Sequence, residues 1–183
     1  MKDIATYSVR AFVLTVLLSA TACGSTTPSQ TPQSTRIMNA AQCHVTDGRA
    51  DRRCTPGALN PVVTQATIHQ TICVPGWSAK VRPPAAFTNR IKRQAMANYG
   101  ITDQLSTVEL DHLVPIEDGG YPGDAQNQAD PRNLQQLWPE SWTGMPNAHT
   151  KDLQENATHA AVCADRITLK QGQDQLIMNW SHP

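Results

Sequence analysis

An alternating segment near the middle of the chain, residues 107–112, most constrains what this sequence can fold into. Its apolar and polar side chains alternate one by one, which is the period of a β-strand with one buried face. Gly119 and Gly120 then predict a turn, and a polar loop is expected to reach Pro131. Residues 133–138 can return as a short second strand or extended segment. This stretch therefore predicts two strands joined by a turn and a long loop.

A helix is expected after the second strand. Pro146 and Asn147 favour its start, and it should run to about Cys163. Its apolar side is predicted to contain four residues: Leu153, Ala157, Ala160 and Ala161. Three side chains that can carry charge or bind a metal recur every four residues and share another face of this helix: Lys151, Glu155 and His159.

Further helices are expected on both sides of this unit, from about Thr88 to Asn98 and from about Thr168 to Trp180. Residues 60–73 contain many β-branched side chains without a regular period, so helix and strand both remain open there. The tryptophans are far apart in the sequence, so we expect them to pack in the core and at its edges: Trp77, Trp138, Trp142 and Trp180. The pattern predicts a mainly helical, single α+β domain over residues 38–183.

The first 22 residues have the composition of an export signal. A basic start is followed by twelve largely apolar residues, 11–22, which are too few to span a bilayer as a helix. The small residues directly before Cys23 resemble the lipobox of bacterial lipoproteins, which implies lipidation of Cys23; cleavage after Ala22 is the alternative. Residues 23–37 are rich in Ser, Thr, Pro and Gln and predict a disordered tether. We therefore expect an exported lipoprotein that is bound to a membrane and faces the periplasm or the cell exterior.

Four further cysteines support an oxidising compartment, because their number is even and none forms a C-x-x-C pair. Three pairings are possible. We favour Cys43 with Cys54, which closes a short polar loop, and Cys73 with Cys163, which ties the front of the domain to its back. A zinc site is the less favoured alternative, since ligands at short spacing are missing.

Charge is unevenly distributed although the net charge is zero. Residues 52–102 contain seven basic and no acidic side chains, whereas residues 103–165 contain eleven acidic and two basic ones. The basic part is suited to phosphate, with Arg90 and Arg93 beside the apolar stripe of the first helix, and the acidic part is suited to a cation. Alternatively, the two parts pair with each other in the fold.

The adjacent Asp111 and His112 end the first predicted strand, and His159 lies on the helix that follows the second. This order resembles the HNH endonucleases over residues 106–163. The resemblance implies a ββα-metal motif, in which two short strands and a helix hold one divalent cation. The chain also looks like a group of exported bacterial HNH-like proteins in three earlier segments, residues 54–61, 71–77 and 81–83. The resemblance therefore extends over most of the mature domain.

His112 is the natural general base, because a neutral imidazole can take a proton from water that attacks phosphorus. Asn133 resembles the middle Asn of the HNH pattern, which holds the loop and the imidazole by hydrogen bonds. Lys151 is expected to lie near the scissile phosphate or to hold a ligand carboxylate in place. Arg132 is expected to act in the same way.

The resemblance implies Asp111, Glu155 and His159 as the metal ligands. Glu155 stands where colicin-type nucleases usually have a His, so a solvated partner of Lys151 is the alternative for it. Asp152 could replace it as the ligand, although it lies on another side of the helix. An acid at this position favours Mg²⁺ or Mn²⁺, while His159 leaves Zn²⁺ or Ni²⁺ possible.

Two functions follow as hypotheses. The first is an exported, monomeric, metal-dependent endonuclease that cleaves nucleic acid, DNA rather than RNA. The second is a non-catalytic lipoprotein that uses the same scaffold for binding or for a structural role.

Overall fold

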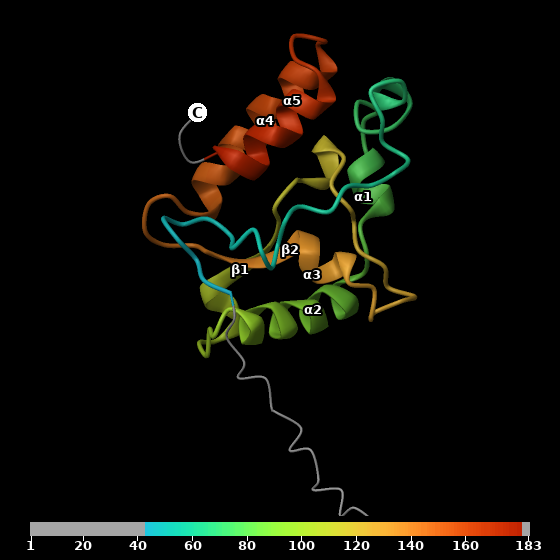
Figure 1. Cartoon of the computed structure of the whole chain (residues 1–183). Coiled ribbons are helices and arrows are strands. Elements are labelled where there is room, and N and C mark those ends of the chain that lie inside the picture. Colours follow the sequence, from blue (N-terminus) through green and yellow to red (C-terminus); the bar gives the residue numbers. More distant parts are fainter. Residues whose placement is uncertain (1–42, 181–183) are drawn as a thin grey trace, which may run out of the picture. The chain divides into compact units, whose positions relative to one another are not determined.

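A two-stranded antiparallel sheet forms the middle of the described structure, with helices packed around it (Figure 1). The computed structural model describes residues 43–180, so the predicted export signal, Cys23 and the tether lie outside the described residues. Strand β1 (Val108–His112) pairs with β2 (Leu137–Ser141), which places Asp111 opposite Trp138 and Glu109 opposite Glu140. Opposite residues share a face of the sheet, so the two glutamates and Asp111 lie on the same side.

Helices make up most of the regular structure within residues 43–180. They are α1 (Trp77–Val81), α2 (Ala85–Asn98), α3 (Arg132–Gln136), α4 (Ala148–Cys163) and α5 (Leu169–Met178). Three short 3₁₀ helices are η1 (Ile68–Gln70), η2 (Leu105–Thr107) and η3 (Ile116–Asp118). Helix α2 packs along the sheet, and α4 packs against α5 (Figure 1). The α+β class and the mainly helical character are therefore confirmed.

The predicted starts of the last two helices have a clear local cause. Asn147 accepts a hydrogen bond from the backbone N–H of Thr150 and Thr168 accepts one from Gln171, so each helix begins with a capping box. These caps satisfy backbone groups that have no partner inside the helix. Among residues 43–180, no helix is both long enough and apolar enough to cross a bilayer.

The predicted second strand begins too early in the sequence. Residues 132–136 form helix α3, and β2 starts only at Leu137. Asp130 and Pro131 account for the difference, because the Asp130 side chain accepts a hydrogen bond from the backbone of Arg132 and Pro131 has helical dihedral angles that start the turn. Asn133 consequently lies on a helix and not on a strand.

The predicted apolar side of α4 is wrong. Leu153 is 68% exposed, and the buried positions are Ala148, Lys151, Thr158 and Val162. The helix turns its Lys151 face inward because carboxylates inside the fold bind this ammonium group, as described below. The apolar residues Leu153 and Ala157 are therefore exposed, and Lys151 of the face expected to form the site is buried.

Residues 60–73 form neither a long helix nor a strand. Threonine side chains in this segment bind nearby backbone: the Thr67 hydroxyl lies 2.9 Å from the carbonyl oxygen of Val62, and the Thr71 hydroxyl lies 2.7 Å from that of Thr67. Such local bonds compete with regular structure. The segment still places Ile68 and Ile72 in the core.

The two glycines after β1 are required because a side chain would be strained at one position and would clash at the other. Gly119 has φ of 82°, which favours glycine. A Cβ atom at Gly120 would lie only 1.8 Å from the carbonyl oxygen of Val114. This turn lets the segment around Leu59 approach and form an isolated bridge with Gly120.

Both predicted disulfides, Cys43–Cys54 and Cys73–Cys163, are present. Each lies at the edge of an apolar cluster: Cys54 packs against the one that contains Trp138, and Cys73 and Cys163 pack against the one that contains Ile68. The disulfides therefore connect loop ends directly to the core.

Removing the Cys73–Cys163 bond by a double Cys→Ser change is expected to lower the free energy of unfolding by about 4–5 kcal/mol, because it closes a loop of 90 residues. Removing Cys43–Cys54, with a separation of 11 residues, is expected to cost about 3 kcal/mol. Chemical unfolding of both variants measures the difference. A thermal midpoint that does not change on reduction would contradict this prediction.

Candidate functional site

Lys151 of α4 is fully buried and holds three groups of the site together. Its Nζ lies 2.8 Å from Oδ2 of Asp111, donates to the backbone carbonyl of His112 at 3.0 Å, and forms an ion pair with Glu155. The ammonium group thus contacts two carboxylates and one backbone carbonyl oxygen. Burial opposes the charge of Lys151, but the carboxylates of Asp111 and Glu155 outweigh this effect and raise its pKa. Lys151 therefore acts as the internal cation of the site.

Two glutamates that sequence reasoning missed join this cluster from the sheet. Glu140 is 1% exposed, and neither of its carboxyl oxygens has a hydrogen-bond partner within residues 43–180. Burial, together with the negative charge of Asp111, raises the pKa of Glu140 to about 10. Burial likewise raises the pKa of Glu109 to about 7. The cluster is therefore neutralised by Lys151 and by protons on its own carboxyl groups.

Asp111 is also held from the opposite strand. The indole Nε1 of Trp138 donates to Asp111 Oδ2 at 2.7 Å, and Trp138 is completely buried. The two residues face each other across the strands, so the register of the sheet creates this bond. Asp111 is thereby fixed between Trp138 and Lys151.

His112 follows Asp111 in the strand and has different partners. Its Nε2 lies 3.3 Å from the carbonyl oxygen of Pro122, and the residue is 7% exposed. Burial lowers the pKa of His112 to about 3; the Pro122 carbonyl opposes this shift, and the positive charges of Arg82 and Lys151 add to it. The imidazole is thus neutral at physiological pH.

Asn133 holds the loop that follows Pro122. Its Oδ1 accepts from the backbone N–H of Asp124 at 2.9 Å, and its Nδ2 donates to the carbonyls of Asn127 and Gln128 at 3.3 and 3.4 Å. The side chain is almost completely buried. Because Pro122 contacts His112, this amide holds the loop that covers the imidazole.

Arg132 is largely engaged within the same loop. It binds Asp130 with a shortest distance of 2.6 Å, and its Cζ lies 4.2 Å from the ring centroid of Tyr121. The Tyr121 hydroxyl also donates to Asp130 at 3.0 Å. Part of the guanidinium still faces solvent, since the side chain is 44% exposed.

The three predicted metal ligands do not meet. Asp111 and Glu155 share the ammonium group of Lys151, whereas His159 Nδ1 lies 2.8 Å from the carbonyl oxygen of Glu117 and its ring lies near Cys163. In the part of the chain that the structure describes, no group of three or more His, Cys, Asp or Glu side chains is arranged to hold a metal ion. The cation that these carboxylates bind is Lys151.

The basic segment stays largely unpaired. Arg90 and Arg93 are exposed on α2, and no ion pair among the described residues involves either of them. Among residues 43–180, His69 makes the one such contact between the basic and the acidic parts, with Asp165 at 3.2 Å, and it is an ion pair only when the imidazole is protonated. The basic and the acidic parts of the sequence therefore do not neutralise each other through direct ion pairs.

Asp118 in η3 is a further buried acid that the sequence pattern did not indicate. It is 0% exposed, and neither carboxyl oxygen has a partner within residues 43–180. Burial raises the pKa of Asp118 to about 8; the negative charges of Glu117 and Glu155 add to this shift and Lys151 opposes it. This carboxyl group is therefore largely protonated in the folded protein at neutral pH.

Replacing Asp118 by Asn is expected to weaken the pH dependence of stability. Between about pH 4 and pH 8 the folded state keeps a proton on Asp118 that the unfolded chain releases, so stability falls as the pH rises through this range. Thermal midpoints at pH 5, 6, 7 and 8 should fall less steeply in Asp118→Asn than in the wild type. Asp174→Asn, which changes an exposed carboxylate, should keep the wild-type slope. Equal slopes in all three proteins would contradict the prediction.

Comparison of the chain with protein-family models, with curated proteins and with solved structures finds no match. A function for this protein is therefore inferred from the geometry of the described residues.

Proposed function

We propose that this protein is an exported nuclease that hydrolyses phosphodiester bonds with His112 as the general base. The observation that carries this proposal is the neutral, buried imidazole at the end of β1, covered by a loop that Asn133 holds. The order of β1, β2 and α4 agrees with the strand, strand and helix of the HNH resemblance and supports the same function.

His112 would take a proton from the water that attacks phosphorus. With a pKa of about 3 its imidazole is neutral but weakly basic. A phosphodiester anion beside it would raise this pKa towards neutrality, because a nearby negative charge favours the protonated ring. Because a carbonyl oxygen only accepts, Nε2 of the neutral ring donates to Pro122, and Nδ1 is the nitrogen that would take the proton.

Phosphate binding is assigned to the basic side chains around the imidazole and on α2. Arg82 is exposed and close enough to influence the pKa of His112. Arg90 and Arg93 extend the positive surface along α2, and Arg132 offers the solvent-facing part of its guanidinium. DNA is the expected substrate, and a monomer is sufficient for this arrangement.

A divalent cation bound by Asp111, Glu155 and His159 does not fit the arrangement of these side chains. Lys151 binds both carboxylates, and His159 bonds the Glu117 carbonyl. No catalytic step is therefore assigned to a metal ion. The role proposed for Lys151 is to hold Asp111 and the His112 backbone in place, because it is too deeply buried to contact a phosphate directly.

A plasmid-nicking assay with the purified, oxidised protein tests the proposal. Parallel reactions contain EDTA, Mg²⁺, Mn²⁺, Zn²⁺ or Ni²⁺, and a salt series accompanies each. Nicking should appear in at least one condition and should fall steeply between about 50 and 200 mM salt, because basic side chains that bind phosphate release counterions. Absence of nicking under every condition would overturn the proposal.

The second candidate is a non-catalytic lipoprotein that uses this scaffold for binding. Two observations favour it: Lys151 already neutralises the carboxylates of Asp111 and Glu155, and the loop at Pro122 covers His112. Salt-sensitive binding of DNA without cleavage under any of the conditions above would support this function in place of the first.

A further inference from the structure

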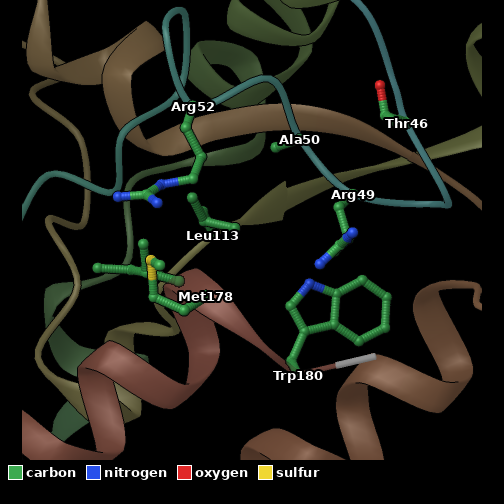
Figure 2. Close-up of a pocket in the computed structure, with 8 residues that line it drawn as sticks. Thr46, Arg49, Ala50, Arg52, Leu113, Met178 and Trp180 are labelled. Atoms are coloured by element: carbon green, nitrogen blue, oxygen red, sulfur yellow. The ribbon is translucent and has the colours of Figure 1, made fainter. Parts of the chain in front are cut away.

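A pocket of about 310 Å³ lies apart from the His112 imidazole, between three segments that are distant in the sequence (Figure 2). The loop closed by Cys43–Cys54 contributes Arg49 and Arg52, and the segment after β1 contributes Leu113. The end of α5 and the residues after it contribute the third wall, which includes Trp180. Its volume is at the lower end of the range for small-molecule sites.

Trp180 provides an unused donor in this pocket. The residue is 1% exposed, and its indole Nε1 has no hydrogen-bond acceptor within residues 43–180. A buried N–H group without a partner is unfavourable, and native structures usually satisfy it. The nitrogen has almost no accessible surface, so an acceptor supplied by a ligand satisfies it only when a neighbouring side chain moves aside.

Arg49 provides a second donor group at the same place. In Figure 2 its guanidinium points towards the indole nitrogen of Trp180. It forms a loose, partly exposed ion pair with Asp47 at 3.7 Å, which is too long for a hydrogen bond and leaves its donors free. Two donor groups thus converge, and Arg52 adds positive charge from another side of the pocket. No acidic side chain lines the pocket.

The remaining wall is apolar. Leu113, Ile177 and Met178 line it beside the indole ring of Trp180. A ligand that matches both parts of the pocket carries an oxyanion at one end and an apolar group at the other. The loop with the two arginines is held by its disulfide and by the Thr46–Arg49 bridge, so little ordering is needed on binding.

We propose that this pocket binds a small organic anion, a carboxylate or phosphate attached to an apolar group. The oxyanion accepts hydrogen bonds from Trp180 Nε1 and from the Arg49 guanidinium, and the apolar group packs on Leu113 and Met178. This site does not depend on nuclease activity.

Titration followed by NMR tests the site directly. The indole N–H resonance of Trp180 is assigned with Trp180→Phe, and the probes are benzoate, phenyl phosphate and inorganic phosphate at low salt. The Trp180 resonance should shift and saturate with benzoate or phenyl phosphate, and the preferred probe identifies the oxyanion. A resonance unchanged by all three probes would overturn the proposal. Equal affinity for inorganic phosphate and phenyl phosphate would overturn the role of the apolar wall.

Variants separate direct contact from general positive charge. Arg49→Gln should weaken binding about tenfold or more, because it removes a charge-assisted hydrogen bond. Arg53→Gln removes the same charge from the same loop, but Arg53 binds Asp51 and does not line the pocket. The affinity of this variant for the probe should therefore stay near that of the wild type. Equal affinities of these two variants would overturn the assignment of Arg49. If Trp180→Phe does not fold, the indole resonance is assigned by triple-resonance NMR of the wild type, and the wild-type titration decides.

Discussion

Replacing His112 by Ala is expected to lower phosphodiester cleavage by about 10²–10⁴-fold, the usual contribution of a general base. The imidazole is neutral at physiological pH and lies at the end of β1, while Asp111 and Lys151 form a separate set of bonds that this change leaves in place. Cleavage rates of wild type and variant in the nicking assay measure the effect, and circular dichroism checks that the variant is folded.

Two controls make this prediction specific. His44→Ala changes an exposed histidine and should retain full activity. His112→Asn keeps a polar side chain of similar size without a basic nitrogen, so it should be as inactive as His112→Ala. If His112→Ala cleaves as fast as the wild type, His112 is not the base and the cleavage comes from another group or from a contaminant.

Replacing Lys151 by Met is expected to lower the free energy of unfolding by about 3–5 kcal/mol at neutral pH. The change leaves the carboxylates of Asp111 and Glu155 inside the fold without a counter-ion and removes the donor to the His112 carbonyl. Loss of the ammonium raises the pKa of both carboxyl groups, so the deficit should shrink as the pH falls and they become protonated. Urea unfolding at pH 7 and at pH 5 measures both effects.

Lys170→Met is the matched control for Lys151→Met. Lys170 also pairs with an acid four residues later, Asp174, but its side chain is 79% exposed, so its loss should change stability little. Adding Asp111→Asn and Glu155→Gln to Lys151→Met should restore part of the stability, because the unpaired charges are then absent. A Lys151→Met protein as stable as the wild type would contradict the central role of this ammonium group.

Local signals predicted much of the fold correctly. The alternation of residues 107–112 indicated β1, and the Asn147 and Thr168 caps fixed where α4 and α5 begin. The even number of cysteines indicated two disulfides, and the favoured pairing is confirmed. The strand and the helix caps depend on residues that are close in the sequence. The disulfides were predictable because four cysteines allow only three pairings.

The second strand and the inner face of α4 were predicted less well. Residues 133–138 are apolar enough for a strand, but the turn at Asp130 and Pro131 starts a helix first. In α4, Leu153 has the composition of a core residue and yet lies in solvent, because the Lys151 side of the helix faces the carboxylates of the sheet. A helical pattern alone does not reveal a buried acidic cluster formed by distant residues.

By itself, the sequence determined the α+β class, the strand that carries Asp111 and His112, the helix that carries Lys151, Glu155 and His159, and the cysteine pairing that we favoured. The tertiary structure alone decided the partners of these side chains. It placed Lys151 between Asp111 and Glu155, turned His159 to the Glu117 carbonyl, and buried Glu140 and Asp118 without partners. It also brought Arg49 and Trp180 to one pocket. The physical reason is that spacing along a helix or strand orders side chains on a face, whereas burial and charge pairing depend on which distant face packs against it.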